Sequence, residues 1–302
     1  MALSKIKIAV ASGKGGVGKS LISSSLSLLF SQDYLVTALD ADVDAPNLHL
    51  WLGQDEEWEE LKDISTGKRP VIDYGKCNGC QKCVDACAFG ALSFKDHRLS
   101  INKYLCEGCG ACQMVCPRQA ITMKPVKNAQ LRVKKVHFDN LNRFNREIVL
   151  ISGQLYPGYT GSGQVVDILK EECEKSKYEV MIVDSPAGTG CPVIAALKDV
   201  DFVVLVTEPT PAGASDLGRV LEVVSHFNLP FGVVINKWDI NTTEARRIQK
   251  EFKREFLGKI AYDKRIFKSI SYLTPVMMTN LPAKKEIKDI FNKMTKKDIK
   301  RN

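Results

Sequence analysis

The chain has 302 residues, of which 44% are hydrophobic and 26% are charged, a composition typical of a globular protein with a substantial hydrophobic core. No run approaches the ~18 apolar residues that a membrane-spanning helix needs, and the N-terminus lacks a secretory pattern, so we expect a cytoplasmic protein. The 43 basic and 35 acidic side chains give a net charge of +8, which alone does not choose among nucleic acid, an anionic membrane and an acidic protein as partner.

The first predicted element is a buried parallel strand over residues 6–11, which are apolar and often β-branched. It leads directly into a run with the G-x4-G-K-S spacing of a phosphate-binding loop, formed by Gly13, Lys14, Gly15, Gly16, Val17, Gly18, Lys19 and Ser20. Glycines let successive N–H groups face the phosphates, Lys19 supplies charge to the β and γ phosphates, and the Ser20 hydroxyl ligates Mg²⁺. A helix over residues 19–30 follows and directs its positive end at the anion.

Two later strands are followed by acidic residues that suit such a site. The second predicted strand leads into Asp40, Asp42 and Asp44, and a later strand ends in Asp184, ahead of a loop that contains Gly188. We expect Asp184 to hold Mg²⁺ through water and the Gly188 N–H to donate to the γ-phosphate. This loop would then sense whether that phosphate is present.

A second lysine, Lys14, makes the phosphate loop resemble the deviant loop of the MinD, ParA, Mrp and nitrogenase-iron-protein group. In that group the early lysine reaches across a dimer to the nucleotide of the partner subunit. The resemblance implies that catalysis needs two subunits, either a homodimer or a heterodimer with a paralogous chain. The alternative is that Lys14 is a solvated loop cation.

Two further positions take their roles from the same resemblance. Asp40 and Asp42 match the D-x-D switch of MinD and Mrp proteins, which implies that Asp42 orients or deprotonates the attacking water and joins the Mg²⁺ site, while Asp40 and Asp44 are structural or magnesium-linked. Asn236 stands where MinD-like proteins recognise adenine, which favours ATP. The run from Asn236 to Asp239 nearly matches the guanine-reading N-K-x-D pattern, so the local motif leaves GTP open.

Eight of the ten cysteines form two copies of the pattern Cys-x2-Cys-x2-Cys-x3-Cys. Because the cytosol keeps thiols reduced, metal binding is favoured over disulfides. Three closely spaced thiolates wrap three corners of a 4Fe–4S cube, and the fourth cysteine completes the other cube. One predicted set is Cys77, Cys80, Cys83 and Cys116, and the other is Cys106, Cys109, Cys112 and Cys87. Zinc is the alternative, but two zinc sites would need paired doublets.

The cysteine segment resembles a bacterial-type two-cluster ferredoxin, with Ala88 where that family usually has proline. Two cysteines lie outside it. Cys173 is expected to be a packed thiol, and Cys191, which follows the Gly188 loop, receives no assigned role.

Strands and helices alternate along the rest of the chain, which indicates an α/β fold with a doubly wound, mainly parallel sheet and the nucleotide at the carboxyl ends of the strands. The predicted strands lie near 5–11, 34–40, 147–152, 179–184, 201–207, 231–236 and 257–261, and the helices over 164–175, 213–227 and 243–256. The α+β ferredoxin-like segment interrupts this alternation. The predicted parts are a first ATPase part over 1–65, an insertion over 66–125 and a second ATPase part over 126–302.

As a whole the chain resembles MinD-superfamily P-loop ATPases with an inserted ferredoxin domain. The resemblance implies that a dimer closes around ATP and Mg²⁺ and that this closure is coupled to electron transfer through two 4Fe–4S clusters to a redox partner protein, with no nucleic-acid partner. Two alternatives remain, namely an iron–sulfur cluster carrier of the Mrp type and a positional ATPase of the MinD type.

The C-terminal residues 283–302 carry eight basic and three acidic side chains. Their apolar residues Ile287, Ile290, Phe291 and Met294 have the spacing of one helix face. This helix either packs on the sheet with its lysines in water, or makes peripheral membrane contact as the basic C-terminal helix of MinD proteins does.

Overall fold

The computed structural model describes residues 5–138 and 147–297. Within them the main sheet contains β1 (Ile6–Ser12), β2 (Val36–Asp40), β3 (Glu60–Ile64), β8 (Ala129–Val136), β9 (Ile148–Leu155), β10 (Val180–Ala187), β11 (Phe202–Thr207), β12 (Phe231–Asn236) and β13 (Phe256–Ile260). Their order is β13-β12-β11-β1-β10-β2-β9-β8-β3. Neighbours from β13 to β9 run parallel, whereas β8 and β3 pair antiparallel at one edge. The predicted α/β class with a mainly parallel sheet is confirmed.

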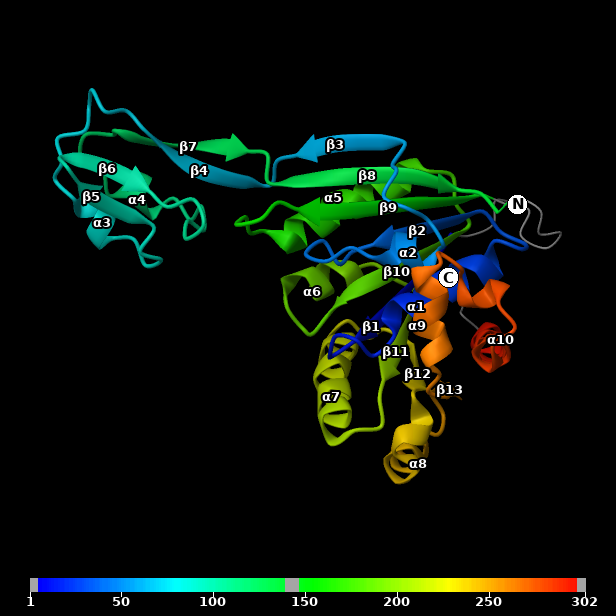
Figure 1. Ribbon diagram of the computed structural model, residues 1–302. Coiled ribbons are helices and arrows are strands. Elements are labelled where there is room, and N and C mark those ends of the chain that lie inside the picture. The colour runs from blue at the N-terminus through cyan, green and yellow to red at the C-terminus, as the bar shows by residue number, and fades with distance from the viewer. Residues whose placement is uncertain (1–4, 139–146, 298–302) are drawn as a thin grey trace.

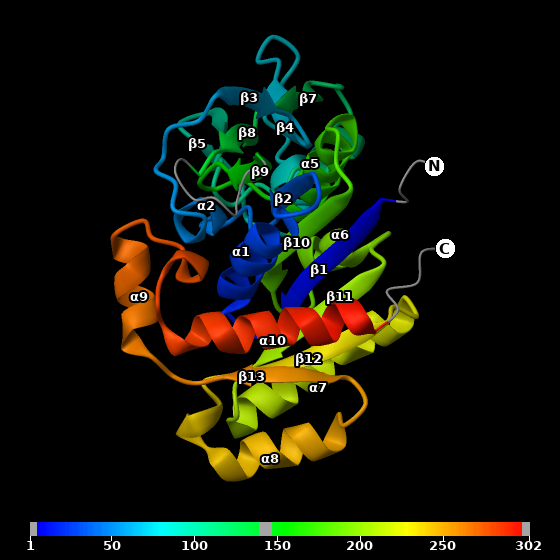
Figure 2. The same ribbon diagram turned by 90° about the vertical axis from the view of Figure 1, so that its right-hand side faces the viewer.

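Helices cover both faces of the sheet (Figures 1 and 2). The first face packs against α1 (Lys19–Phe30), α2 (Leu48–Trp51), α9 (Lys264–Ser271) and α10 (Pro282–Lys296), and the second against α5 (Ser162–Lys175), α6 (Cys191–Leu197), α7 (Pro211–His226) and α8 (Thr242–Glu251). Side chains of β1 alternate between the two cores, since Ile8 and Val10 enter the first and Ala9 and Ala11 the second. Burial on both faces explains the continuous apolar run that predicts this strand.

The C-terminal helix α10 packs on the sheet through its apolar face. Ile287, Ile290 and Met294 are buried in the first core, and the ring of Phe291 lies 4.8 Å from that of Phe30, centroid to centroid. Figure 2 shows the helix lying across the sheet near β13. Of the two interpretations of the tail, the packed helix is the one that the structure contains. Among the described residues no helix is long and apolar enough to span a membrane.

Residues 66–125, which we call the inserted segment, project from the β3 and β8 edge of the sheet (Figure 1). The projection starts with β4 (Gly67–Ile72) and β7 (Ile121–Val126), which pair antiparallel in a ribbon separate from the main sheet. Beyond the ribbon lie α3 (Lys82–Asp85), β5 (Leu92–Lys95), β6 (Arg98–Ile101) and α4 (Ala111–Met114). A small core that includes Leu92, Leu99 and Ile121 holds these pieces together.

Asn128, between β7 and β8, joins three pieces of chain at the base of the ribbon. Its side-chain oxygen accepts from the Thr66 N–H (2.8 Å), and its amide nitrogen donates to the Thr66 hydroxyl (2.7 Å) and to the Thr160 carbonyl (3.1 Å). The residue is 0% exposed. Because Thr160 belongs to residues 156–161 between β9 and α5, which we call the support loop, Asn128 ties the ribbon to that loop.

A second contact connects the inserted segment with the support loop. Arg69 of β4 donates to the Gly158 carbonyl (2.7 Å) and to the Lys103 carbonyl, and its guanidinium lies 4.3 Å from the centroid of the Tyr159 ring. The Tyr104 ring covers Gly158 so closely that a Cβ there would fall 2.2 Å from it, so only glycine fits. The inserted segment is therefore held at two points, its ribbon base and this ring contact.

The sequence missed two strands and misplaced one helix end. β3 and β8 were not predicted, because four of the five β3 residues are exposed and polar residues interrupt both strands. The helix predicted over 243–256 ends at Glu251, since the chain turns before entering β13 at Phe256. β10 also continues past Asp184 to Ala187.

Candidate functional site

The phosphate loop lies between β1 and the N-terminus of α1, as the spacing predicts. Gly18 precedes α1 with a φ of 100°, and a Cβ there would fall 2.4 Å from the Asn236 amide nitrogen, so no larger residue fits. Gly16 is also left-handed, with a φ of 77°. The first turn of α1 carries no acidic side chain. Its unpaired N–H groups and positive helix end therefore suit an anion.

A pocket of about 390 Å³ opens beside this loop, a volume in the range of small-molecule sites. Its walls come from the loop, from the segment after β2 and from the region between β13 and α9. The lining residues are Gly15, Gly16, Gly18, Lys19, Ser20, Leu21, Asp42, Asn47, Trp51, Ala187, Asn236, Lys237, Ala261, Tyr262, Asp263, Ile266 and Phe267. The lining combines glycine backbone, two lysines and a hydroxyl, which suit phosphates, with aromatic side chains, which suit a flat ring.

The predicted nucleotide residues divide between this pocket and its surroundings. Seven line it, namely Gly15, Gly16, Gly18, Lys19, Ser20, Asp42 and Asn236, whereas Gly13, Lys14, Val17, Asp184 and Gly188 do not. Lys14 is exposed, so its side chain is available to a second subunit. The Gly188 N–H donates to the Ser12 carbonyl (3.0 Å) and would have to leave this bond to reach a γ-phosphate. The Asn236 amide donates to the Val17 carbonyl (2.8 Å), so one of its donors already braces the loop.

Two buried acids lie side by side beneath the pocket. Asp184 of β10 is paired in register with Asp40 of β2, and they are 2% and 1% exposed. An Asp184 oxygen accepts from the Ser23 hydroxyl (2.7 Å), and the Ser20 side chain also bonds to this carboxyl. Burial raises the pKa of both carboxyls, and the Asp184 charge raises that of Asp40 further. A hydroxyl and carboxylates beside Lys19 form the oxygen donor set that Mg²⁺ prefers.

Asp42 lies nearer the pocket opening than the two buried acids. Burial raises the pKa of its carboxyl, whereas the nearby Lys19 lowers it. Its backbone N–H donates to Asp40 (3.2 Å), whose other oxygen accepts from the Leu48 N–H (2.8 Å). The carboxyl of Asp40 therefore fixes the backbone on both sides of the predicted switch, which supports the structural role expected for it.

A polar row continues from these acids across the sheet. In register, Asp40 is paired with Ser152 of β9, and Ser152 with Arg132 of β8. Alternate residues of a strand point to opposite faces, so Asp184, Asp40, Ser152 and Arg132 all face the side that α1 and α2 cover. The row reaches by strand register from the Mg²⁺ donor set to the strand that follows Asn128, and the Ser152 hydroxyl within it makes no hydrogen bond to the described residues. No sequence motif marks this row, because strand pairing brings the four residues together from distant positions.

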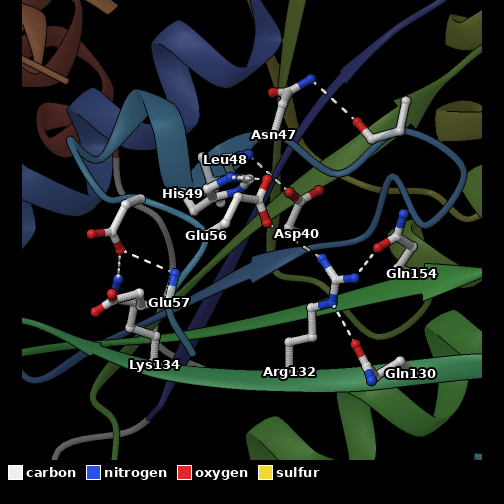
Figure 3. A network of polar contacts seen from close by, with 12 residues as sticks. Asp40, Asn47, Leu48, His49, Glu56, Glu57, Gln130, Arg132, Lys134 and Gln154 are labelled. Carbon is white, nitrogen blue, oxygen red and sulfur yellow. Dashed lines mark hydrogen bonds and ion pairs between the residues drawn. The ribbon is translucent and has the colours of Figure 1, made fainter. Parts of the chain in front are cut away.

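Figure 3 shows how this row meets α2. Arg132 donates to Gln130 (3.0 Å) and to Gln154, and lies 3.8 Å from Glu56. A ring nitrogen of His49, which is 1% exposed, lies 3.0 Å from the same Glu56 carboxylate. Burial lowers the pKa of His49, while Glu56 opposes that shift. The network ties α2, whose Trp51 lines the nucleotide pocket, to β8.

The inserted segment contains two further pockets, each lined by four cysteines. Cys77, Cys80, Cys83 and Cys116 line one, and Cys87, Cys106, Cys109 and Cys112 line the other. These are the two crossed sets that the spacing predicts. Phe94, Leu99 and Ile121 add apolar walls to the first pocket, and Phe89 and Leu92 to the second.

Matching backbone features surround the two pockets. The Ala91 N–H donates to the Cys87 sulfur and the Ala120 N–H to the Cys116 sulfur, both at 3.3 Å. Among residues 5–138 and 147–297, no three His, Cys, Asp or Glu side chains converge as a single metal ion would require.

The remaining cysteines lie elsewhere. Cys173 of α5 is fully buried, and burial raises the pKa of its thiol, which agrees with the packed thiol expected there. Cys191 begins α6 and is exposed. A Cβ added to Gly163 at the start of α5 would fall 3.2 Å from the Cys191 Cβ, so the starts of α5 and α6 touch.

Comparison with known proteins supports the nucleotide site. The CobQ/CobB/MinD/ParA nucleotide-binding domain matches residues 8–276. An uncharacterized protein of Methanocaldococcus jannaschii is 36% identical over 291 residues, covering 96% of each chain. An iron–sulfur cluster carrier protein of Pyrococcus horikoshii is 23% identical over 97% of this chain and 86% of its own length. Among solved structures, the septum site-determining protein MinD of Pyrococcus horikoshii, complexed with Mg-ADP, superposes with a TM-score of 0.58 at 16% identity, covering 99% of this chain and 100% of MinD.

The family match spans the phosphate loop, the acidic residues after β2 and at β10, and Asn236. These are also the parts of the chain that surround or underlie the nucleotide pocket. The chain therefore belongs to the CobQ/CobB/MinD/ParA family of nucleotide-binding domains and is a P-loop ATPase of the MinD/ParA type.

Proposed function

We propose that two subunits of this ATPase close around ATP and Mg²⁺, and that closure is coupled to electron transfer through two 4Fe–4S clusters held by the inserted segment. The observation that carries the proposal is one chain with a P-loop nucleotide pocket and two four-cysteine pockets, each lined by one crossed ligand set. Neither feature alone would suggest coupling.

In the nucleotide half of the proposal, Lys19 binds the β and γ phosphates, and Ser20 and Asp184 hold Mg²⁺. Asp42, at the pocket wall, orients the attacking water or accepts its proton. Lys14 acts on the nucleotide of the second subunit. Its exposure and its absence from the wall of its own pocket support that assignment.

In the redox half, the eight cysteine thiolates hold the clusters, each of which takes up or releases one electron when bound. The N–H groups of Ala91 and Ala120 donate to ligand sulfurs, a contact that stabilises the more negative state and raises the potential. Apolar side chains line part of each pocket, while Cys80 and Cys109 stay exposed. Burial raises the pKa of the Cys83 and Cys112 thiols, so metal binding there releases protons.

Two structural connections support coupling between the halves. The first runs from the Gly188 loop to the start of α6 and then to Gly163 of α5. It continues into the support loop, where the Tyr104 ring of the inserted segment covers Gly158. The second is the polar row from Asp184 to Arg132 of β8, the strand that follows Asn128. Both begin beside the phosphate loop; the first ends at the contact of the Tyr104 ring with Gly158, and the second ends at Arg132, four residues along the chain from Asn128.

Anaerobic purification with iron analysis and EPR tests the cluster half. We expect a brown protein with about eight irons per chain. Redox titration with and without ATP and Mg²⁺, for wild type and Lys14→Ala, tests coupling. We expect the nucleotide to change the potential or reduction rate in the wild type only. Colourless, zinc-loaded protein would refute the cluster assignment, whereas identical titrations in all conditions would refute coupling alone.

The second candidate function is cluster delivery, which the relatives named iron–sulfur cluster carrier proteins favour. It predicts that a labile cluster passes to an apo-protein acceptor on mixing, whereas the electron-transfer proposal predicts retention by four thiolates per cluster. A MinD-like positional role at a membrane is less favoured, since the apolar face of α10 is already buried. Vesicle cosedimentation with ATP, repeated without residues 284–302, tests that role.

A further inference from the structure

The two cysteine pockets are copies of one another, built from positions 29 residues apart, as Cys77 and Cys106 are. The matched lining pairs are Cys77 and Cys106, Asn78 and Glu107, Gly79 and Gly108, Cys80 and Cys109, Gln81 and Gly110, Cys83 and Cys112, Cys116 and Cys87, Arg118 and Phe89, Ala120 and Ala91, and Ile121 and Leu92. The two pockets can therefore be compared position by position. Because both would bind the same kind of cluster, a difference in residue type at a matched position points to some other role.

The pockets lie at different distances from the ATPase. Pro70 and Met123, which face each other midway along the β4 and β7 ribbon, line the pocket of Cys106, and a Cβ on Gly108 would fall 2.3 Å from the Lys68 carbonyl. We call it the inner pocket. The pocket of Cys77 takes from the ribbon only Ile121, at the far end from the ATPase. We call it the outer pocket.

The outer pocket has a basic residue at three matched positions where the inner pocket has a neutral one, and the inner pocket has Glu107 where the outer pocket has Asn78. Around the outer pocket these positions carry Lys76, Lys82 and Arg118, and around the inner pocket they carry Leu105, Ala111 and Phe89. Arg118 lines the outer pocket directly, and the two lysines immediately precede the ligands Cys77 and Cys83. All three basic residues are exposed. We call them the basic rim.

The basic rim keeps most of its charge uncompensated. Lys76 lies 3.7 Å from Asp73, while Lys82 and Arg118 make no ion pair with the described residues. The inserted segment as a whole has nine basic and four acidic side chains, so the neighbourhood adds to the positive potential. Cys80 is exposed, and so is its match in the inner pocket, Cys109, so the basic rim and not thiol exposure distinguishes the outer pocket. The outer pocket thus opens to the surface within a ring of cations.

We propose that the basic rim is the docking face for an acidic redox protein, which approaches the outer pocket. This inference rests on the proposed function, because a redox partner has reason to approach a cysteine pocket only if that pocket holds a cluster. Transient redox complexes bury little area, so complementary charge around the site largely sets their rate and orientation. The inner pocket lacks the rim and lies beside the support loop. It would therefore exchange electrons on the ATPase side.

Charge reversal on the full-length, cluster-loaded protein tests the docking face. The rim variant combines Lys76→Glu, Lys82→Glu and Arg118→Glu. The matched control combines Lys68→Glu, Lys95→Glu and Lys124→Glu, which are exposed residues of the same segment whose reversal changes the net charge equally. The probe is an acidic bacterial two-cluster ferredoxin, whose binding is measured by surface plasmon resonance over a range of ionic strength.

We expect the wild type to bind the probe at low ionic strength and to lose affinity as salt is added. The rim variant should bind at least about tenfold more weakly, and the control within about threefold of wild type. Equal losses in both variants, or no binding by the wild type at low salt, would overturn the proposal. The proposal would also be overturned if the rim bound phosphatidylserine vesicles or duplex DNA and did not bind the ferredoxin.

Iron content and reduction by dithionite separate this proposal from the one on which it rests. Wild type without iron would contradict the proposed function itself. If all three proteins hold about eight irons and react with dithionite at one rate, but bind ferredoxin without regard to the rim, only the docking face is refuted.

Discussion

At the scale of residues, the nucleotide pocket lies above carboxylates that the fold itself does not neutralise. Asp184 and Asp40 are adjacent and almost fully buried, and Lys19 is the cation that lowers the pKa of Asp184. Two buried carboxylates beside one lysine carry more negative charge than the lysine offsets, which favours a divalent cation there.

The pH dependence of stability follows from this arrangement. In EDTA, folding raises the pKa of Asp184 and Asp40 above the ordinary 3.8, so the folded chain retains protons that the unfolded chain releases. The free energy of unfolding should therefore fall as the pH rises above about 4. Asp184→Asn, which keeps an oxygen for Ser23, should flatten this dependence in urea titrations. A steeper fall in the variant would contradict it.

Mg²⁺ supplies a second readout on the same variant. At pH 7.5 we expect added Mg²⁺ to raise the melting temperature of the wild type, because an ion that binds only the folded state stabilises it. The shift should be lost in Asp184→Asn and kept in Asp199→Asn, a matched change at an exposed position. Equal shifts in all three proteins would place the cation elsewhere.

The two loop lysines should separate binding from catalysis. Lys19→Ala should abolish ATP binding, because Lys19 lines the pocket. Lys14→Ala should leave affinity within about threefold and reduce hydrolysis at least about 100-fold, by analogy with cations supplied in trans. Calorimetry and phosphate release measure the two effects. If the hydrolysis rate per subunit of the wild type does not depend on protein concentration, Lys14 does not act across subunits.

At the scale of elements, the sequence predicts those parts whose signal is local. β1, the phosphate loop and α1 are recognisable because an apolar run, a glycine pattern and a helix start follow one another. The cysteine pockets are recognisable because spacing alone encodes the crossing. Asn128 and Arg132 could not be assigned, since each acts through residues brought close only by the fold. β3 was missed because an exposed edge strand carries no apolar run.

The hydrogen bonds of the Asn128 side chain should stabilise the base of the ribbon. Asn128→Ala removes three partly buried hydrogen bonds, each worth about 1 kcal/mol, so we expect a loss of about 2–3 kcal/mol in unfolding free energy. Hydrogen exchange should increase at Thr66 and in the support loop. Asn292→Ala, at an exposed position of α10, is the control. Unchanged exchange at Thr66 would show that the ribbon base is held by other contacts.

At the scale of the whole molecule, the inserted segment is attached at a narrow base. Its ribbon is a sheet of its own, and the first pair of that ribbon joins Gly67 to Val126. The contacts at Asn128 and Arg69 both end on the support loop. The ATPase therefore retains its sheet, its two cores and its nucleotide pocket without any residue from beyond the ribbon.

Excision of the inserted segment tests this independence. Replacing residues 69–124 by a two-residue Asn-Gly turn joins strands that already pair antiparallel. We expect ATP affinity within about threefold of the full chain, because the nucleotide pocket contains no residue of the inserted segment. Iron should be absent. Aggregation, or loss of ATP binding, would mean that the segment helps to hold the pocket together.

The strand order also has a consequence for biosynthesis. β1 and β2 are not neighbours, because β10 separates them, and β2 touches only β10 and β9. β1 and β2 thus find no partner until residues beyond 148 leave the ribosome, whereas the strands of the inserted segment complete their pairing within residues 67–126. Local pairing precedes distant pairing in folding, so this part of the nascent chain can acquire structure before the domain that binds ATP exists.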